Sequence, residues 1–316
     1  MQIRSTTPET PLDVLIVGAG FAGLGAARYL QHQQQNHDNN CWIVEGRDYI
    51  GGRSRTITLD DGILKAELGS QWIQGAAPSN PVYKALLECS GKTNVDFELE
   101  DEDSSAAVYF TSSSTDEVHR LDDEEVRRLV EGLYGGPQGF SEYQANLQDE
   151  GDEDRSLRSI ADDYIQERGL TRFETHALEW MLDSIIASEY AADLDDLSHW
   201  WWDDDKELEG GDIYLAKSKE MGFSKIIENY AEPVMDNISL KTKVKSVDWS
   251  NPTVAVKVQI CPDLNEATIY AKHVLLTVPL GVLKAGSIDF KPNLPPVKTK
   301  AIESLGMGGL SKCVLL

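Results

Sequence analysis

The stretch from Asp13 to Glu45 decides the fold. It contains DVLIV (13–17), GAGFAG (18–23), LGAARYLQHQQQ (24–35) and CWIVE (41–45). The first apolar run, with its β-branched residues, indicates a strand, and the glycine-rich turn leads straight into a helical segment. The second apolar run indicates another strand, which ends in an acid. Strand, glycine turn, helix and strand in this order predict an α/β, Rossmann-like fold.

The three spaced glycines of the turn each have a physical role. Gly18 permits the tight turn, Gly20 lets the backbone approach a pyrophosphate, and Gly23 lets the helix pack against the strand. The helix N-terminus that follows presents free N–H groups and a partial positive charge to phosphates. This pattern favours dinucleotide binding over an ordinary turn between a strand and a helix.

Glu45 and the residues after it narrow the choice of dinucleotide. An acid at the end of the second strand can accept hydrogen bonds from a ribose, and it argues against a 2′-phosphate and so against NADP. Gly51, Gly52 and Arg53 follow within GRDYIGGRSRT (46–56). This second glycine pair fits either another close approach to phosphate or flavin or a polar hairpin turn, and spacing alone does not decide between them.

Four segments carry a resemblance to a known family: VGAGFAGLGAARYL (17–30), VEGRDYIGGR (44–53), AELGSQWIQG (66–75) and TVPLGVLK (277–284). They resemble the flavin-dependent amine oxidases, which include polyamine oxidases, monoamine oxidases and flavin-dependent lysine demethylases. The resemblance implies bound FAD, a small-molecule amine as substrate and dioxygen as electron acceptor. The cofactor-binding residues it implies are Gly18, Gly20, Gly23, Glu45, Arg47, Gly51, Gly52, Arg53, Gly69, Ser70, Gln71, Trp72 and Val244.

The resemblance also implies a domain plan. An FAD-binding domain is expected from the separated segments 1–79 and 218–283. A mostly helical substrate-binding domain is expected over 80–217, and residues 284–316 would begin the α+β substrate-domain sheet. Members of the family continue well past the position of Leu316. We therefore expect this sequence to be a fragment, an incomplete gene model or a truncated product.

The segment LSKCVLL (310–316) contains a lysine in an apolar setting. Both faces of a strand here would be largely apolar, which predicts a buried strand with an ordinary buried thiol at Cys313. Lysine is rarely buried without a need for it, although Lys312 could equally snorkel to solvent from the start of the strand. By resemblance, Lys312 is the catalytic lysine that holds a water against the flavin N5.

Three further residues bear on the substrate. At the position where polyamine oxidases have Glu or His near the amine, this chain has Gln74, which carries no charge. Glu189 and Tyr190 match an acid–aromatic pair of the substrate tunnel, and an ordinary helix end is the alternative reading. A polyamine is therefore the expected substrate. A lysine demethylase-like oxidase is the enzymatic alternative, and a non-catalytic truncated remnant or interaction protein is the other.

Helix patterns are clearest between residues 157 and 190. Thr171 with Glu174 predicts a capping box, and Asp122–Glu125 predicts the acidic first turn of another helix. Apolar residues cover a wide arc after Thr171 and predict a largely buried helix. They include Phe173, Leu178, Trp180, Met181, Leu182, Ile185 and Ile186.

Composition limits which partners and which cellular compartment are expected. The 316 residues carry a formal net charge of −24, which argues against direct nucleic-acid binding. Cys41, Cys89, Cys261 and Cys313 match no zinc pattern, so no metal site is expected. We find no membrane-spanning run and no signal-peptide core. A cytoplasmic location is expected, with a peroxisomal one possible if the natural C-terminus lies beyond Leu316; the sequence does not indicate the oligomeric state.

Overall fold

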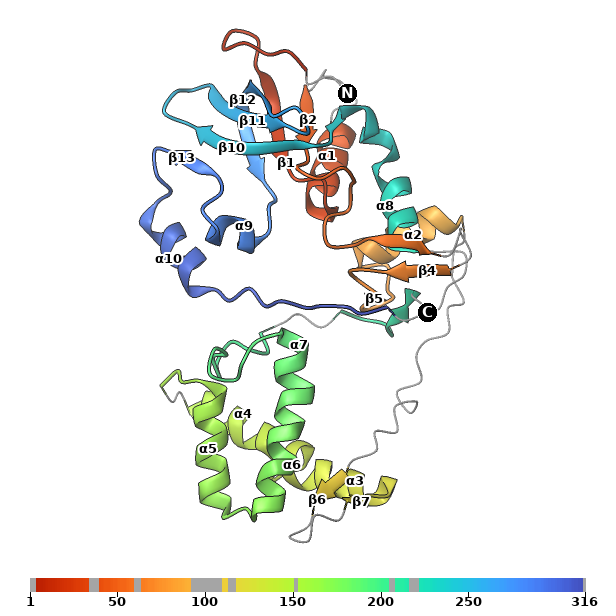
Figure 1. The fold of residues 1–316 in the computed structure, drawn as a ribbon, viewed down its shortest axis with the longest axis vertical. Helices are drawn as coiled ribbons and strands as arrows, with labels where there is room; N and C mark the ends of the chain where they lie inside the picture. Colours follow the sequence, from red (N-terminus) through yellow and green to blue (C-terminus); the bar gives the residue numbers. More distant parts are fainter. Residues whose placement is uncertain are drawn as a thin grey trace. The chain divides into compact units, whose positions relative to one another are not determined.

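The computed structural model describes residues 4–33, 40–59, 64–91, 110–112, 118–150, 153–204, 208–215 and 222–314. The chain forms two compact units (Figure 1). Unit 1 comprises residues 1–100, 208–305 and 312–316, and unit 2 comprises residues 101–207 and 306–311.

A seven-stranded sheet forms the centre of unit 1, in the order β13-β10-β11-β12-β1-β2-β9. β1 (Leu12–Val17) lies between β2 (Cys41–Val44) and β12 (Asn265–Leu276) and is parallel to both. β9 (Ile238–Ser239) extends the sheet beyond β2. The sheet thus joins strands from distant parts of the chain, as predicted for a domain built from separated segments.

The other side of the sheet is an antiparallel meander. β12 pairs with β11 (Val254–Ile260), and β11 pairs with β10 (Thr242–Asp248). β13 (Asp289–Lys291) closes this edge, parallel to β10.

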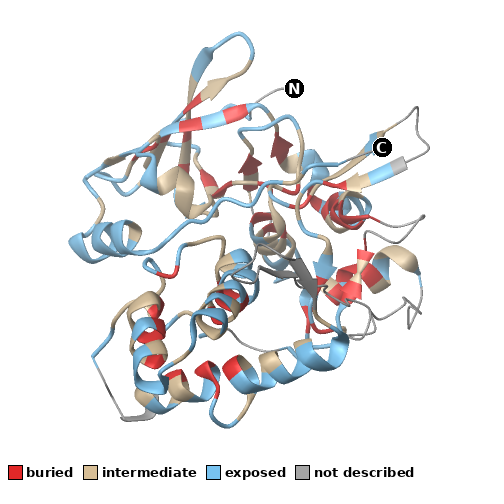
Figure 2. Cartoon of the chain, turned by 60° about the horizontal axis from the view of Figure 1, so that its bottom comes forward, coloured by how far each residue is buried: buried red, intermediate tan, exposed pale blue. Residues whose placement is uncertain are grey.

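Unit 1 has two apolar cores. A single strand contributes side chains to both, because successive residues of a strand point to opposite faces. Ile16 of β1 joins a core with α1 (Phe21–Gln33), α2 (Pro81–Ser90) and α8 (Phe223–Ala231). Leu15 and Val17 join a second core made with β10, β11 and β12. Figure 2 shows buried residues along these strands and helices. α2 packs against α8 inside unit 1, although the sequence analysis placed residues 80–91 with the substrate domain.

Three two-stranded antiparallel sheets complete the described strands. β3 (Thr56–Leu59) pairs with β4 (Leu64–Glu67), and β5 (Trp72–Ile73) pairs with β8 (Ile213–Tyr214). In unit 2, β6 (Phe110–Ser112) pairs with β7 (Val118–Arg120).

The other regular elements in the described part of unit 2 are helices. α3 (Asp123–Val130) continues as a π-helical turn over Glu131–Gly135 and is followed by α4 (Phe140–Glu150) and α5 (Leu157–Arg168). α6 (Arg172–Leu182) continues through a π-helical turn over Asp183–Ala187 into α7 (Ser188–Tyr190). Both predicted helix starts are confirmed, because Asp122 and Thr171 each form a capping box, with Glu125 and Glu174.

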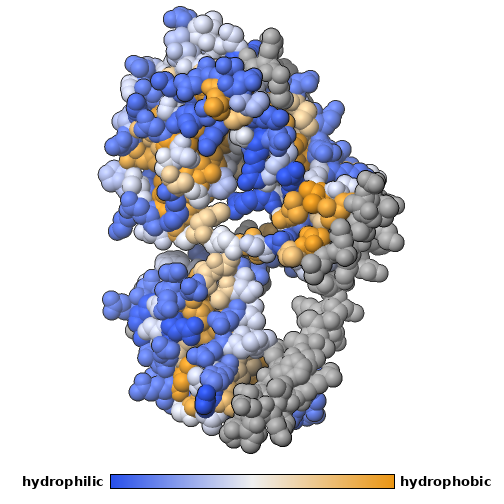
Figure 3. Space-filling model, viewed as in Figure 1, coloured by the Kyte–Doolittle hydropathy of each residue, from blue (hydrophilic) through white to orange (hydrophobic). Residues whose placement is uncertain are grey.

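The predicted burial of α6 and its continuation is only partly right. Leu178 and Ile186 are fully buried against α5, in a core that also contains Tyr164. Phe173, Trp180 and Ile185, however, are each 41% exposed. Figure 3 shows apolar patches, in orange, among the hydrophilic residues of both units.

After β12 come two short helices, α9 (Leu280–Lys284) and α10 (Pro296–Ser304). The prediction of a buried strand over residues 310–316 is wrong for its described part. Residues 305–314 have no regular secondary structure, and Leu310 is 69% exposed. A strand needs a neighbour for its backbone groups, and no described strand pairs with this segment. Cys313, expected to be buried, is exposed.

Candidate cofactor-binding and catalytic site

The first glycine turn leaves one side of its backbone open. Gly18 has a φ of +111°, and a Cβ there would lie 2.7 Å from Oγ1 of Thr277. A Cβ on Gly23 would lie 1.9 Å from the carbonyl oxygen of Gly18. A Cβ on Gly20, in contrast, would meet no atom within 4 Å. Gly18 and Gly23 are therefore required by packing, whereas Gly20 leaves room for a phosphate beside the N-terminus of α1.

Glu45 ties this turn to the end of β2. Its Oε2 accepts a hydrogen bond from the backbone N–H of Ala19 at 2.9 Å, and its Oε1 accepts one from the N–H of Arg47 at 2.8 Å. A carboxylate has about four acceptor sites, so two backbone bonds leave capacity for ribose hydroxyls. The placement fits the predicted role.

The second glycine turn packs against the first. The N–H of Gly51 donates to the carbonyl of Ala19 at 2.8 Å, and a Cβ on Gly52 would lie 3.7 Å from the Cα of Gly20. The turn joins β2 to β3, which do not pair with each other, so it is not a hairpin turn. The hairpin-turn alternative is therefore excluded, and the role of this glycine pair at a cofactor stays a prediction. The two glycine turns face each other, as two close approaches to one cofactor require.

Arg47 and the strand of Val244 lie at the same end of the sheet. Arg47 Nη1 donates to the hydroxyl of Tyr49 and, at 3.5 Å, to the carbonyl of Gly52. The carbonyls of Glu45 and Arg47 accept hydrogen bonds from the N–H groups of Thr242 and Lys241, each at 2.7 Å. Val244 itself is 5% exposed, and the pairing of β10 with β11 shifts register between Val244 and Ser246. The structure thus brings the β2 loop and the start of β10 together.

The segment from Gly69 to Trp72 lies beside Arg53. A Cβ on Gly69 would lie only 1.6 Å from the carbonyl oxygen of Arg53, so glycine is required there. The Oγ atoms of Ser54 and Ser70 lie 2.9 Å apart. The carbonyl of Gln71 accepts a hydrogen bond from Leu215, and the ring of Trp72 lies 4.5 Å from that of Tyr214. Arg53 is exposed, and its backbone carbonyl accepts a hydrogen bond from the N–H of Ser70 at 3.3 Å.

Lys312 reaches this same segment. Its Nζ donates to the carbonyl of Glu67 at 3.2 Å and to the carbonyl of Gly69. Desolvation lowers the pKa of Lys312 below its usual value, and the charge of Glu67 opposes that shift. Although the strand around it was wrongly predicted, Lys312 lies half-buried next to the segment expected along the flavin.

The three predicted substrate residues lie in different units. Gln74 is exposed in unit 1, where its carbonyl accepts a hydrogen bond from Nδ2 of Asn80 at 2.7 Å. Glu189 and Tyr190 belong to α7 in unit 2, and the ring of Tyr190 packs edge-on against Trp202 at 5.8 Å. Their role in substrate binding stays a prediction.

Two residues of the site were missed by sequence reasoning. Thr277 follows β12 and its Oγ1 donates to the carbonyl of Val17, so it buttresses the first glycine turn. Glu67 is a buried acid at the end of β4. An acid inside the apolar-flanked AELG was a usable signal for Glu67. No signal pointed to Thr277, because its contact depends on β1 and β12 pairing across the chain.

Neither a metal site nor a membrane-spanning helix is found among the described residues. No group of His, Cys, Asp and Glu side chains there could hold a metal ion. No described helix has the length and apolar character needed to cross a membrane.

A sheet with parallel central strands, a glycine turn after the first of them, an acid at the end of the second and a facing pair of glycines are the features of a dinucleotide-binding α/β protein. The chain belongs to the family described as flavin containing amine oxidoreductase, whose model matches residues 21–316. The predictions of the family and of a flavin cofactor, FAD, are thereby confirmed.

Two relatives agree with this assignment. Polyamine oxidase 3 of Oryza sativa subsp. japonica is 29% identical over 99% of this chain and 60% of its own length. Lysine-specific histone demethylase 1 homolog 1 of the same organism is 32% identical over 97% of this chain and 34% of its own length. The chain therefore spans 60% or less of the length of these relatives.

A solved structure confirms the fold. Wild-type putrescine oxidase bound to putrescine superposes with a TM-score of 0.60 and 20% identity, over 93% of this chain and 63% of that chain. The predicted α/β class with a Rossmann-like cofactor domain is correct.

Proposed function

We propose that the protein to which this chain belongs is an FAD-dependent amine oxidase acting on polyamines. The observation that carries the proposal is the placement of Lys312, whose amine is bonded to the carbonyls of Glu67 and Gly69 beside the Gly69–Trp72 segment. The polyamine oxidases among the relatives support the substrate class.

We assign the chain's residues the following tasks. The open backbone at Gly20 and the N-terminus of α1 would hold the pyrophosphate, and Glu45 would accept hydrogen bonds from the ribose. The backbone at Val244 would contact the adenine. When bound, the flavin supplies the two-electron oxidation of the amine C–N bond and passes the electrons to dioxygen, giving hydrogen peroxide. The resulting imine hydrolyses to an aldehyde.

Lys312 would act at the reacting centre. Its amine, fixed by two carbonyls, would hold a water there and move a proton through it. Glu189 and Tyr190 would contribute a cation-binding pair for a polyamine nitrogen, and Gln74 would contribute polarity without charge. We propose no direct nucleic-acid partner.

The second candidate is a lysine demethylase-like oxidase. It is favoured by relatives named as histone demethylases, at up to 32% identity. The chemistry at the C–N bond is the same, so only the substrate separates the two candidates.

One experiment tests both. Peroxide release by the full-length protein is compared for spermine, spermidine, their acetylated forms, benzylamine and a methylated lysine peptide, in wild type and Lys312→Met. We expect turnover of the polyamines, and a loss of roughly 10²–10⁴-fold in Lys312→Met, typical of removing a positioned proton-transfer group. The flavin absorbance should remain.

Lys300→Met is the matched control, because Lys300 is an exposed lysine of α10. It should keep wild-type rates. Rates within a few-fold of wild type in Lys312→Met would remove Lys312 from the mechanism, and turnover of the peptide alone would favour the second candidate.

A further inference from the structure

Glu67 is a buried carboxyl group whose position the fold strictly determines. It ends β4 and is 5% exposed. Its Oε1 accepts hydrogen bonds from the hydroxyl of Thr56 at 2.9 Å and from the N–H of Phe223 at 3.0 Å. A Cβ on Gly222 would lie 2.8 Å from this Oε1, so glycine is what allows the N-terminus of α8 to come so close.

The other carboxyl oxygen has no hydrogen bond within the described chain. Oε2 of Glu67 is buried, and no described donor reaches it. Leaving a buried anion half-satisfied is costly unless nearby positive charge compensates. The chain supplies two such sources: the N-terminus of the nine-residue α8 and the amine of Lys312. The presence of Glu67 in this setting is better explained by an electrostatic role than by packing.

The main chain around Glu67 also orients Lys312. Two hydrogen-bond donors of the amine are used by the carbonyls of Glu67 and Gly69. An ammonium has three N–H donors, so one remains. A neutral amine has only two, and its third direction is a lone pair that accepts. The third position on the Lys312 nitrogen is therefore a hydrogen-bond donor when the amine is protonated and an acceptor when it is neutral.

We propose that Glu67 is a positioning residue for Lys312: Thr56 and the N-terminus of α8 hold its carboxyl group at the end of β4, beside the two carbonyls that bind the amine, and its charge favours the protonated amine. This inference rests on the proposed role of Lys312. It predicts that Glu67 controls the fraction of molecules in which Lys312 can accept a proton from a bound water.

The surroundings contain few competing charges. Thr56 of β3 and the backbone of α8 face the carboxyl group with neutral donors. Among the described residues, Glu67 is the charged group that acts on Lys312, raising its pKa against the lowering caused by desolvation. Removing the charge should therefore leave desolvation unopposed and lower the pKa of Lys312.

The test measures the amine directly, without relying on catalysis. Acetic anhydride is applied to the full-length protein across a pH series, and acetylation of Lys312 is quantified by peptide mass spectrometry. Only the free amine reacts. In Glu67→Gln, which keeps an oxygen for Thr56 and Phe223, the labelling curve should move to lower pH, with severalfold faster labelling below the wild-type midpoint.

Two controls separate charge from structure. Thr56→Val removes one hydrogen bond to Oε1 but keeps the charge, and Glu67→Asp keeps the charge on a shorter side chain. Both should label Lys312 close to the wild-type curve. An unmoved curve in Glu67→Gln, or a curve moved equally in either control, overturns the proposal.

A second route remains if Glu67→Gln does not fold. Glu67→Met, which also removes the charge, then takes its place: a labelling curve at lower pH than wild type would support the proposal, and a curve at the wild-type position would overturn it. The activity of Lys312→Met tests the proposed function independently.

Discussion

At the scale of single residues, burial should rank the reactivity of the cysteines. Burial raises the pKa of the Cys41 thiol to about 11, and Cys41 is 9% exposed, whereas Cys313 is exposed. Because the thiolate is the nucleophile, we expect iodoacetamide at pH 8 to label Cys313 quickly and Cys41 hardly at all. Mass spectrometry of labelled peptides would measure this, with Cys41 becoming reactive on denaturation. Equal native rates would contradict the packing of β2.

Residue roles that depend on local backbone geometry were predictable. Gly18 and Gly23 lie where any side chain would collide with the turn, and that requirement is visible in the spacing of the motif itself. The burial of Cys313 was not predictable, because burial requires a neighbour that an apolar pattern cannot supply. Thr277 was missed for the same reason: its partner, Val17, lies 260 positions earlier in the chain.

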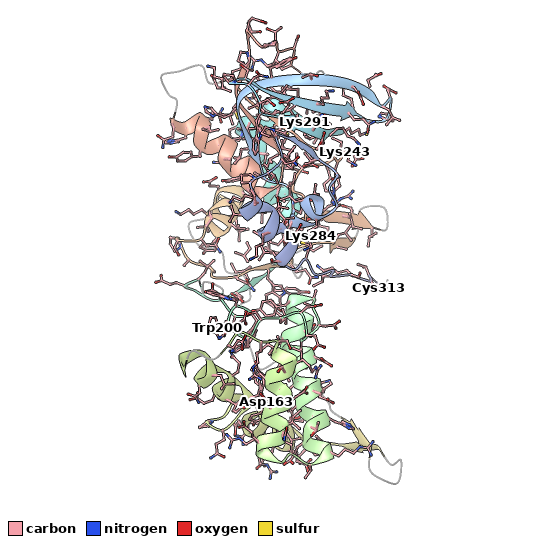
Figure 4. All side chains as sticks on the ribbon, turned by 90° about the vertical axis from the view of Figure 1, so that its left-hand side faces the viewer. Asp163, Trp200, Lys243, Lys284, Lys291 and Cys313 are labelled. Atoms are coloured by element: carbon pink, nitrogen blue, oxygen red, sulfur yellow. The ribbon has the colours of Figure 1, made fainter. Side chains whose placement is uncertain are left out.

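At the scale of elements, Lys284 should hold the end of α10. Its Nζ donates to the carbonyls of Ile302, Glu303 and Leu305, at 2.8–3.0 Å, and Figure 4 labels it at the end of α9. A cation at a helix C-terminus satisfies free carbonyls and suits the helix dipole. Lys284→Met should cost about 1 kcal/mol and speed amide hydrogen exchange in α10.

Lys298→Met is the control for this variant, because Lys298 is an exposed residue of the same helix. Its exchange rates should stay at wild-type values. If Lys284→Met leaves the amides of α10 equally protected, the three hydrogen bonds contribute nothing to the helix end.

Helix starts were predictable as elements, since a capping box is a pattern of nearby residues, as at Thr171 with Glu174. The strand expected after Leu310 was not correct, because strand formation depends on a partner strand rather than on the segment alone.

At the scale of the whole molecule, the separated cofactor segments were predicted, because the opening motif and the late segment TVPLGVLK (277–284) each resemble the same family. Sequence patterns alone did not assign α2 to its unit. The pattern of α2 predicts a helix, but only its packing on α8 places it in unit 1. Every residue predicted to bind the cofactor lies in unit 1.

The two units have separate apolar cores, so a cavity in one should act on that unit alone. Leu178 is fully buried in the core of unit 2, with Ile160 and Tyr164. Leu178→Ala should destabilise unit 2 by about 2–5 kcal/mol, through lost burial and the cavity left behind. Because separate cores permit separate transitions, the loss of bound flavin on heating should keep its midpoint.

Thermal unfolding of the full-length protein would be followed with two signals. Four of the seven tryptophans, at positions 180 and 200–202, lie in unit 2, so the variant Trp42→Phe/Trp72→Phe/Trp249→Phe would make tryptophan fluorescence report on that unit, while flavin absorbance reports on unit 1. Leu310→Ala is the matched control, since Leu310 is 69% exposed and its loss should change stability by less than about 0.5 kcal/mol. A flavin midpoint that falls together with the tryptophan midpoint in Leu178→Ala would mean that the two units unfold as one.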